Sequence, residues 1–212
     1  MFWLDIKALD ISVAGAYAFR ALMESGRNDM PIHTFKVPGP VGATRERGRE
    51  FREKLEDLLR KANPGDIVEI DITEPEALSV SFSDELIGRL LAARAAGDFQ
   101  DRAVIIVGAS EDTRETIEAV LQRRNVPGVY RDSRTNQIVA LAGASWFPET
   151  LRQASGLRAS FRATELGEKL GLSPQAANNR LRALTTSGAL VRERITPDRG
   201  GKEFEYRVAF RS

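Results

Sequence analysis

The sequence predicts an α/β or α+β N-terminal domain over residues 1–143, followed by a small domain of two helices and a β-hairpin over residues 148–212. Strand and helix patterns alternate through the first part, which is typical of a layered domain. The second part has two short helical patterns and then two strand patterns around a glycine-rich turn. Charge also separates the ends, because residues 158–212 carry 11 basic and 6 acidic side chains, whereas residues 1–157 are net acidic by 4.

Composition limits the possible functions. The chain of 212 residues is 42% hydrophobic and 29% charged, as expected for folded globular proteins. It has no cysteine and a single histidine, His33, which excludes disulfides, thiolate zinc sites and multi-histidine metal sites. No apolar run of 18 residues and no signal-peptide pattern occurs. We therefore expect a cytoplasmic protein with no membrane partner and no cofactor.

The first half begins with a possible strand at residues 2–6 and a helix that Ser12 would cap. A second strand is predicted at residues 32–37. Residues 44–62 predict an amphipathic helix, because its apolar side chains recur on one face. This stripe consists of Phe51, Leu55, Leu58, Leu59 and Ala62.

Two further strands are predicted: residues 67–72, with one apolar face formed by Val68, Ile70 and Ile72, and residues 103–107, whose continuous apolar run indicates burial on both faces. Ser83 is predicted as the N-cap of a helix that buries Leu86, Ile87, Leu90 and Leu91. Ser110 is predicted as the N-cap of a later helix. A final strand pair is expected at residues 129–131 and 138–141.

The helix at Arg45–Arg52, the strand at 67–72 and the run Ser81-Phe82-Ser83-Asp84-Glu85-Leu86 resemble a STAS-like domain over residues 32–142. The resemblance implies a module for protein interaction or sensing. In signalling members of that family a serine near this helix start is phosphorylated, and Ser81 and Ser83 occupy that neighbourhood. The Asp-Ser-Ser-Gly pattern of those members is absent, and Asp84 and Glu85 would repel a phosphate. We therefore expect Ser83 to act as a helix cap.

In the C-terminal part, a first short helix is predicted from a Thr164 cap to Gly171. Ser173 and Pro174 then begin a second helix, with serine as N-cap and proline at the first helical position. Its buried stripe is expected to consist of Ala177, Leu181 and Leu184. Strands around residues 189–191 and 204–208 follow, separated by a turn that contains Pro197, Gly200 and Gly201.

The ordered spacing of these elements resembles the winged helix-turn-helix family of bacterial regulators. The matching residues are Ala163-Thr164-Glu165-Leu166, Leu170-Gly171-Leu172-Ser173, Asn179-Arg180-Leu181-Arg182-Ala183-Leu184 and Gly188-Ala189-Leu190-Val191. The resemblance implies that the second helix enters the major groove of double-stranded DNA and that the hairpin, or wing, lies along the phosphate backbone.

The outward face of the second helix is suited to reading bases. Asparagine and glutamine pair with adenine and arginine pairs with guanine, and no acidic residue interrupts residues 173–187. Ser173 at the helix start is expected to bind a phosphate, and the wing arginines and lysine are expected to do the same. The predicted DNA-binding residues are Ser173, Gln175, Asn178, Asn179, Arg182, Arg192, Arg194, Arg199 and Lys202.

These features predict a transcriptional regulator that binds DNA as a homodimer and responds to a protein or small-molecule effector at its N-terminal domain. Gly15, Ala18, Phe19 and Leu22 are the candidate dimer interface. One alternative is an interaction adaptor of the anti-sigma-factor-antagonist type. The other alternative is a metal-dependent enzyme acting on nucleic acid, whose Mg²⁺ ligands would come from Glu69, Asp71, Glu74, Glu76, Asp84 and Glu85. We do not expect catalytic activity, since no catalytic motif accompanies these carboxylates.

Overall fold

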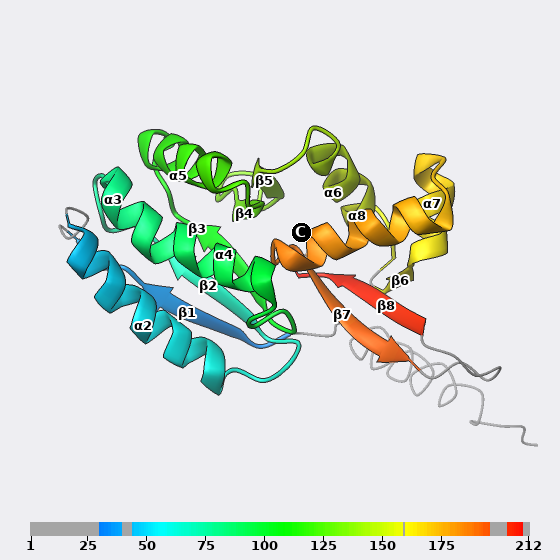
Figure 1. Ribbon diagram of the computed structural model, residues 1–212, viewed down its shortest axis with the longest axis horizontal. Helices are drawn as coiled ribbons and strands as arrows, with labels where there is room; N and C mark the ends of the chain where they lie inside the picture. The colour runs from blue at the N-terminus through cyan, green and yellow to red at the C-terminus, as the bar shows by residue number, and fades with distance from the viewer. Residues whose placement is uncertain (1–29, 40–43, 159, 196–202, 210–212) are drawn as a thin grey trace, which may run out of the picture. The chain divides into compact units, whose positions relative to one another are not determined.

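The structure, a computed structural model, describes residues 30–39, 44–158, 160–195 and 203–209 (Figure 1). The possible strand at 2–6, the helix that Ser12 would cap and the candidate dimer interface at Gly15–Leu22 lie outside these residues. Two β-sheets organise the described chain: five strands in the order β1-β2-β3-β4-β5, and three in the order β6-β8-β7. The fold is therefore mixed α/β, as the alternating pattern predicts.

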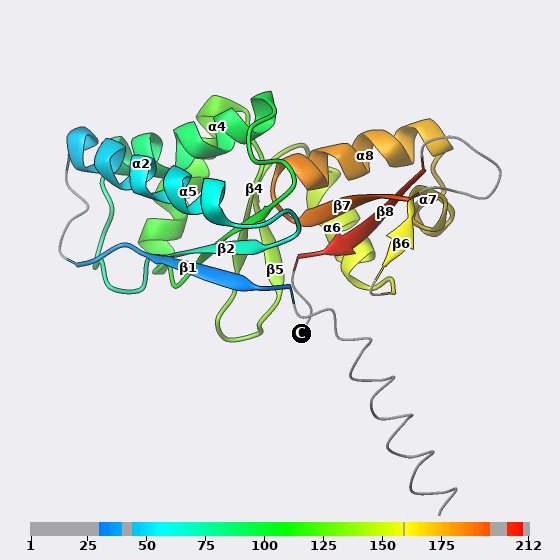
Figure 2. The same cartoon turned by 90° about the horizontal axis from the view of Figure 1, so that it is seen from below.

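The five-stranded sheet is mostly parallel. Strands β1 (Ile32–Lys36), β2 (Ile67–Asp71), β3 (Ala103–Val107) and β4 (Gly128–Arg131) pair in parallel in chain order, and β5 (Ile138–Ala142) pairs antiparallel to β4. Right-handed crossovers between consecutive parallel strands place every connecting helix on the same face of the sheet. Figure 2 shows α2 (Arg45–Lys61) and α4 (Arg89–Ala96) on one side of β1 and β2, and α5 (Glu111–Arg124) contributes Ile117 and Leu121 to the same core.

The core lies between this sheet face and its helices. Alternate residues of a strand point to the same face, so Val68 and Ile70 of β2 reach the core together with Val104 and Ile106 of β3. Helix α2 packs against them through three buried side chains of its predicted stripe, Phe51, Leu55 and Leu59. The sequence expectation for this helix is confirmed, with Thr44 as its N-cap.

The helix after β2 begins earlier than the sequence predicts. Ser79 is the N-cap of α3 (Val80–Ser83), where its hydroxyl accepts a hydrogen bond from the backbone N–H of Phe82 at 3.1 Å. Helix α3 continues without a break into η1 (Asp84–Gly88), a π-helical turn, and then into α4. The prediction that Ser83 caps this helix is therefore wrong. Ser83 is fully buried inside the helical run, whereas Ser81 is exposed.

The second sheet belongs to the C-terminal elements. Helix α6 (Phe147–Ser155) leads to β6 (Phe161–Arg162), α7 (Ala163–Leu170), α8 (Pro174–Thr186), β7 (Leu190–Ile195) and β8 (Glu203–Val208). The predicted cap of α7 is wrong, because Thr164 lies within the helix. The carboxylate of Glu165 instead accepts from the backbone N–H of Arg162 at 2.7 Å. None of the described helices is both long and apolar enough to cross a lipid bilayer.

Candidate nucleic-acid interface

Helices α7 and α8 form a tight pair joined by a short turn. Gly171 ends α7 with φ of 63°, in the left-handed region that favours glycine. Ser173 caps α8 as predicted, because its hydroxyl accepts from the N–H of Ala176 at 3.3 Å, and Pro174 is the first helical residue. A Cβ atom at Gly167 would lie 3.4 Å from the Cβ of Ala177, so glycine allows α7 to approach α8 closely.

One side of α8 is anchored in the protein. Ala177, Leu181 and Leu184 are fully buried, as their spacing predicts. Arg180 adds a polar anchor that the sequence pattern did not reveal: its guanidinium donates to the Thr150 hydroxyl at 3.1 Å and lies 5.1 Å from the ring centre of Trp146. Arg180 therefore links α8 to α6 through contacts within the protein.

The opposite side of α8 is exposed and carries the predicted base-reading residues. Gln175, Asn178, Asn179 and Arg182 are all exposed, and Ser173 lies exposed at the helix start. Their mutual contacts are weak or local, since the Gln175 amide donates to the Asn179 side chain at 3.4 Å and the Asn178 amide donates to the carbonyl of Pro174 at 3.0 Å. The amide and guanidinium groups can exchange these contacts for an external partner at little cost.

The β7–β8 hairpin presents two of the four predicted wing residues. Arg192 and Arg194 are exposed and lie two positions apart on β7, so they share one face of the strand. The guanidinium of Arg192 lies over the Phe204 ring of β8, 4.5 Å from its centre. Arg199 and Lys202 lie outside the described residues.

Two acidic residues of the hairpin have partners within the protein. Glu193 accepts from the guanidinium of Arg207 at 3.1 Å, and Glu205 accepts from the hydroxyl of Ser160 at 2.7 Å. Glu193 also alternates with Arg192 and Arg194 along β7, so its side chain points to the other face. Glu193 and Glu205 therefore offset the positive charge of Arg192 and Arg194 less than the linear sequence suggests.

The C-terminal end of α8 is held against the five-stranded sheet. Gly188 follows α8 with φ of 89°, and a Cβ atom there would lie 2.7 Å from the carbonyl oxygen of Val104 in β3. Arg94 at the end of α4 is fully buried and donates to the carbonyls of Phe99 and Thr185, the latter at 3.3 Å in the last turn of α8. Burial lowers the pKa of Arg94 to about 10, far enough above neutrality that the side chain stays charged.

The carboxylates considered for Mg²⁺ do not gather. Glu69 pairs with Arg131 at 2.7 Å, and burial raises the pKa of Glu69. Asp71 accepts from the hydroxyl of Thr73, and Asp84 and Glu85 are surrounded by arginines. Within the described ranges, no three histidine, cysteine, aspartate or glutamate side chains are grouped so that they could hold a metal ion.

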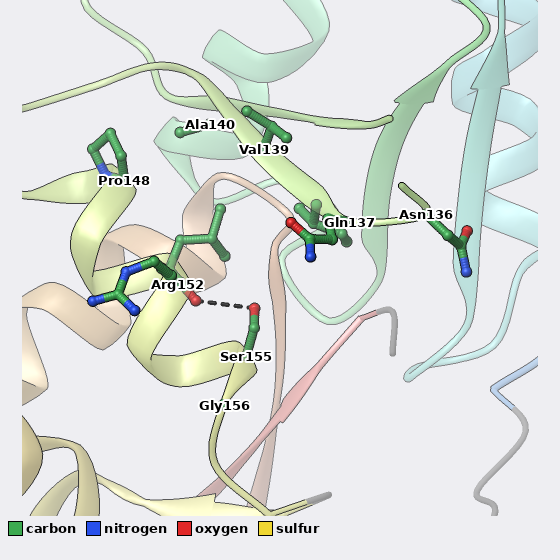
Figure 3. Close-up of a pocket in the computed structure, with 10 residues that line it drawn as sticks. Asn136, Gln137, Val139, Ala140, Pro148, Arg152, Ser155 and Gly156 are labelled. Carbon is green, nitrogen blue, oxygen red and sulfur yellow. Dashed lines mark hydrogen bonds between the residues drawn. The ribbon is translucent and has the colours of Figure 1, made fainter. Parts of the chain in front are cut away.

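A cavity of about 380 Å³ lies between β5 and α6 (Figure 3). Ile138 and Leu151 give it an apolar lining, and Gln137 and Arg152 are among its polar groups. The Ser155 hydroxyl donates to the carbonyl of Leu151 at 3.0 Å and is satisfied within α6. The cavity borders α6, whose residue Thr150 holds Arg180 of α8.

No protein-family model matches the chain, and neither a curated protein nor a solved structure shows significant similarity to it.

Proposed function

We propose that the chain is a DNA-binding transcriptional regulator. In this proposal residues 148–212 form a winged helix-turn-helix that reads operator DNA, and residues 1–143 form a STAS-like domain that controls it. The observation that carries the proposal is the outward face of α8, where exposed amides and a guanidinium project from a helix whose other side is anchored. The hairpin arginines support it, because they add positive charge beside a helix that is free of acidic residues.

Contacts at the end of α8 support control by the N-terminal domain. Gly188 packs on the backbone of β3, and Arg94 of α4 donates to the carbonyl of Thr185, so the sheet domain touches the proposed recognition helix directly. A change of the sheet domain would therefore reposition α8. Homodimer formation, cytoplasmic location and the effector remain predictions.

We expect Asn179→Ala and Arg182→Ala to weaken binding to the preferred DNA site by about 1–3 kcal/mol each and to relax sequence preference. Both side chains are exposed, so the fold should be retained. The full-length chain is first used to select bound fragments of genomic DNA from its source organism, and affinities are then measured on the selected site and on a scrambled duplex. Arg134→Ala, an exposed arginine in the β4–β5 turn, is the matched control. Unchanged affinity and preference in both α8 variants would place recognition elsewhere.

The wing arginine should behave differently. Arg194→Ala is expected to weaken binding to selected and scrambled duplexes equally and to reduce the salt dependence of log Kd by about one unit, as for loss of one phosphate contact. The same result is expected for Arg199→Ala and Lys202→Ala, although these two residues lie outside the described structure. Titrations at several KCl concentrations measure the slope. A loss confined to the selected site would instead mean that Arg194 contacts a base.

A further inference from the structure

Six arginines from three helices converge on two buried carboxylates. Asp84 and Glu85, at the start of η1, are 7% and 1% exposed at their side chains. Helix α2 contributes three of the arginines, the η1–α4 run one and α5 two. We call this group the arginine cluster; it consists of Arg45, Arg49, Arg52, Arg89, Arg123 and Arg124.

Asp84 and Glu85 form ion pairs with all six arginines of the cluster. The Arg124 guanidinium donates two hydrogen bonds to the Asp84 carboxylate, from Nε at 2.6 Å and from Nη2 at 2.9 Å. This pairing lowers the pKa of Asp84. Arg89 Nε lies 3.0 Å from Glu85. The remaining arginines lie 3.2–3.8 Å from one or both carboxylates. The bidentate pair positions Arg124 before any ligand arrives, whereas the longer contacts keep the more exposed arginines beside the carboxylates without fixing them.

Two glycines make this convergence possible. A Cβ atom at Gly48 would lie 3.0 Å from the Cβ of Glu85 and 2.9 Å from the carbonyl oxygen of Phe82, so glycine lets α2 approach η1. A Cβ atom at Gly88 would lie 2.9 Å from Arg124 Nε, so glycine also opens the path of that side chain to Asp84. The meeting point is a π-helical turn, a distortion that is often found at functional sites.

The cluster leaves unneutralised positive charge on the surface. Glu56 is the one further carboxylate paired with a member, Arg52, among the described ion pairs, and it is shared with Arg60 outside the cluster. The excess is therefore at least three positive charges. The outermost members are Arg123 and Arg49, 60% and 58% exposed, whereas the acids lie beneath them. The most exposed groups of the cluster are thus guanidinium groups, with Asp84 and Glu85 beneath them.

We propose that the arginine cluster binds the phosphate backbone of nucleic acid, independently of base sequence. The paired N–H donors of a guanidinium group can bind two oxygens of one phosphate at the same time. Protein partners usually bury an apolar centre, whereas nucleic-acid interfaces are polar and strongly positive, and this surface is built of arginines. The inference rests on the proposed function in that the duplex read by α8 supplies the phosphates. The cluster would add a second, sequence-independent contact on the STAS-like domain.

The test compares two double variants of the full-length chain with equal loss of charge. Arg49→Gln/Arg123→Gln removes the two outermost cluster arginines and leaves Asp84 and Glu85 with four arginines. The control, Arg114→Gln/Arg152→Gln, removes two arginines that pair with acidic neighbours on their own helices and share no carboxylate with the cluster. Affinities for the selected duplex, a scrambled duplex and single-stranded DNA are measured against KCl concentration. Urea unfolding verifies that each variant is folded.

We expect the cluster variant to reduce the salt slope by about 1.8 on both duplexes, which is equivalent to about 30-fold weaker binding at 0.15 M KCl, and by about 1.4 on single-stranded DNA, while the control matches the wild-type slope. If the cluster variant binds like the wild-type chain, the inference is overturned, whatever the α8 variants show. If the wild-type chain prefers no duplex over another but the cluster variant still shows a reduced salt dependence of log Kd, the proposed function fails and the inference stands. Tight binding of polyglutamate in place of DNA, lost in the cluster variant, would assign the surface to an acidic protein and overturn the inference.

Discussion

Gly188→Ala is expected to destabilise the protein by about 2–5 kcal/mol. Gly188 has φ of 89°, and a side chain in this left-handed region costs about 1–2 kcal/mol. The added methyl group would also lie 2.7 Å from the carbonyl oxygen and 2.8 Å from the nitrogen of Val104, both backbone atoms of β3. Backbone cannot rotate aside as a flexible side chain can, so overpacking adds about 1–3 kcal/mol.

Gly171→Ala provides the matched control. Gly171 also follows a helix, has φ of 63°, and has no atom within 4 Å of a Cβ built on it. Its substitution should therefore show the conformational cost alone, about 1–2 kcal/mol. Urea unfolding of both variants and the wild-type chain gives the two free-energy differences. Equal losses would mean that the contact between Gly188 and β3 does not constrain the fold.

Gly188 also lies where the end of α8 contacts the five-stranded sheet. The backbone N–H groups of Gly188 and Ala189 donate to the carbonyls of Thr185 and Leu184, which closes α8 in a Schellman arrangement directly above β3. Thr185 is also where Arg94 attaches α4 to α8. A substitution at Gly188 thus disturbs the end of α8, about nine residues from Asn179, without touching the proposed DNA-reading side chains.

Local patterns predicted the elements that form the candidate interface. The Ser173-Pro174 start of α8 and its Ala177, Leu181 and Leu184 stripe depend on residues within one or two helical turns of each other. The strands β1 to β5, β7 and β8 were predicted for the same reason, because each apolar run has to face a core, and the structure confirms them. Helix α6 and the two-residue strand β6 were not predicted.

The contacts that join the elements could not be predicted in this way. Arg124 and Asp84 are 40 residues apart, and Arg94 and Thr185 are 91 residues apart. In the sequence, the arginines of α2 alternate with glutamates and look like an ordinary solvated face. Gly48 and Gly88 were the available signals, since each stands within a helical pattern where glycine is unfavourable unless another element approaches closely.

Ser83 shows how a local pattern can mislead. Serine followed by two acidic residues is typical of a helix start, yet Ser79, four residues earlier, makes the capping hydrogen bond. The sequence offers three serines, Ser79, Ser81 and Ser83, that are each able to cap a helix. Packing decided between them, because starting at Ser79 buries Phe82 and continues α3 into the run that buries Leu86 and Leu90.

Ser83→Asp is consequently expected to destabilise the protein by about 3–5 kcal/mol, the cost of an uncompensated buried charge. The Ser83 side chain is fully buried and its hydroxyl has no hydrogen-bond partner, while the buried carboxylate of Asp84 is adjacent. Ser83→Ala should be neutral or stabilising by up to about 1 kcal/mol, because it removes an unsatisfied buried hydroxyl. Ser79→Asp should stay within about 0.5 kcal/mol of the wild-type chain, because aspartate caps as well as serine does.

The pH dependence separates charge from size as the cause. Burial and the neighbouring carboxylate raise the folded-state pKa of the carboxyl introduced by Ser83→Asp above its unfolded value. Its penalty relative to the wild-type chain is therefore fully present above that raised pKa and shrinks as pH falls through it, as the group takes up a proton on folding. Urea unfolding of the three variants at pH 7.5 and pH 5 measures this difference. A loss for Ser83→Asp that is the same at both pH values would indicate steric crowding, and a wild-type stability at pH 7.5 would restore Ser83 as an accessible helix start.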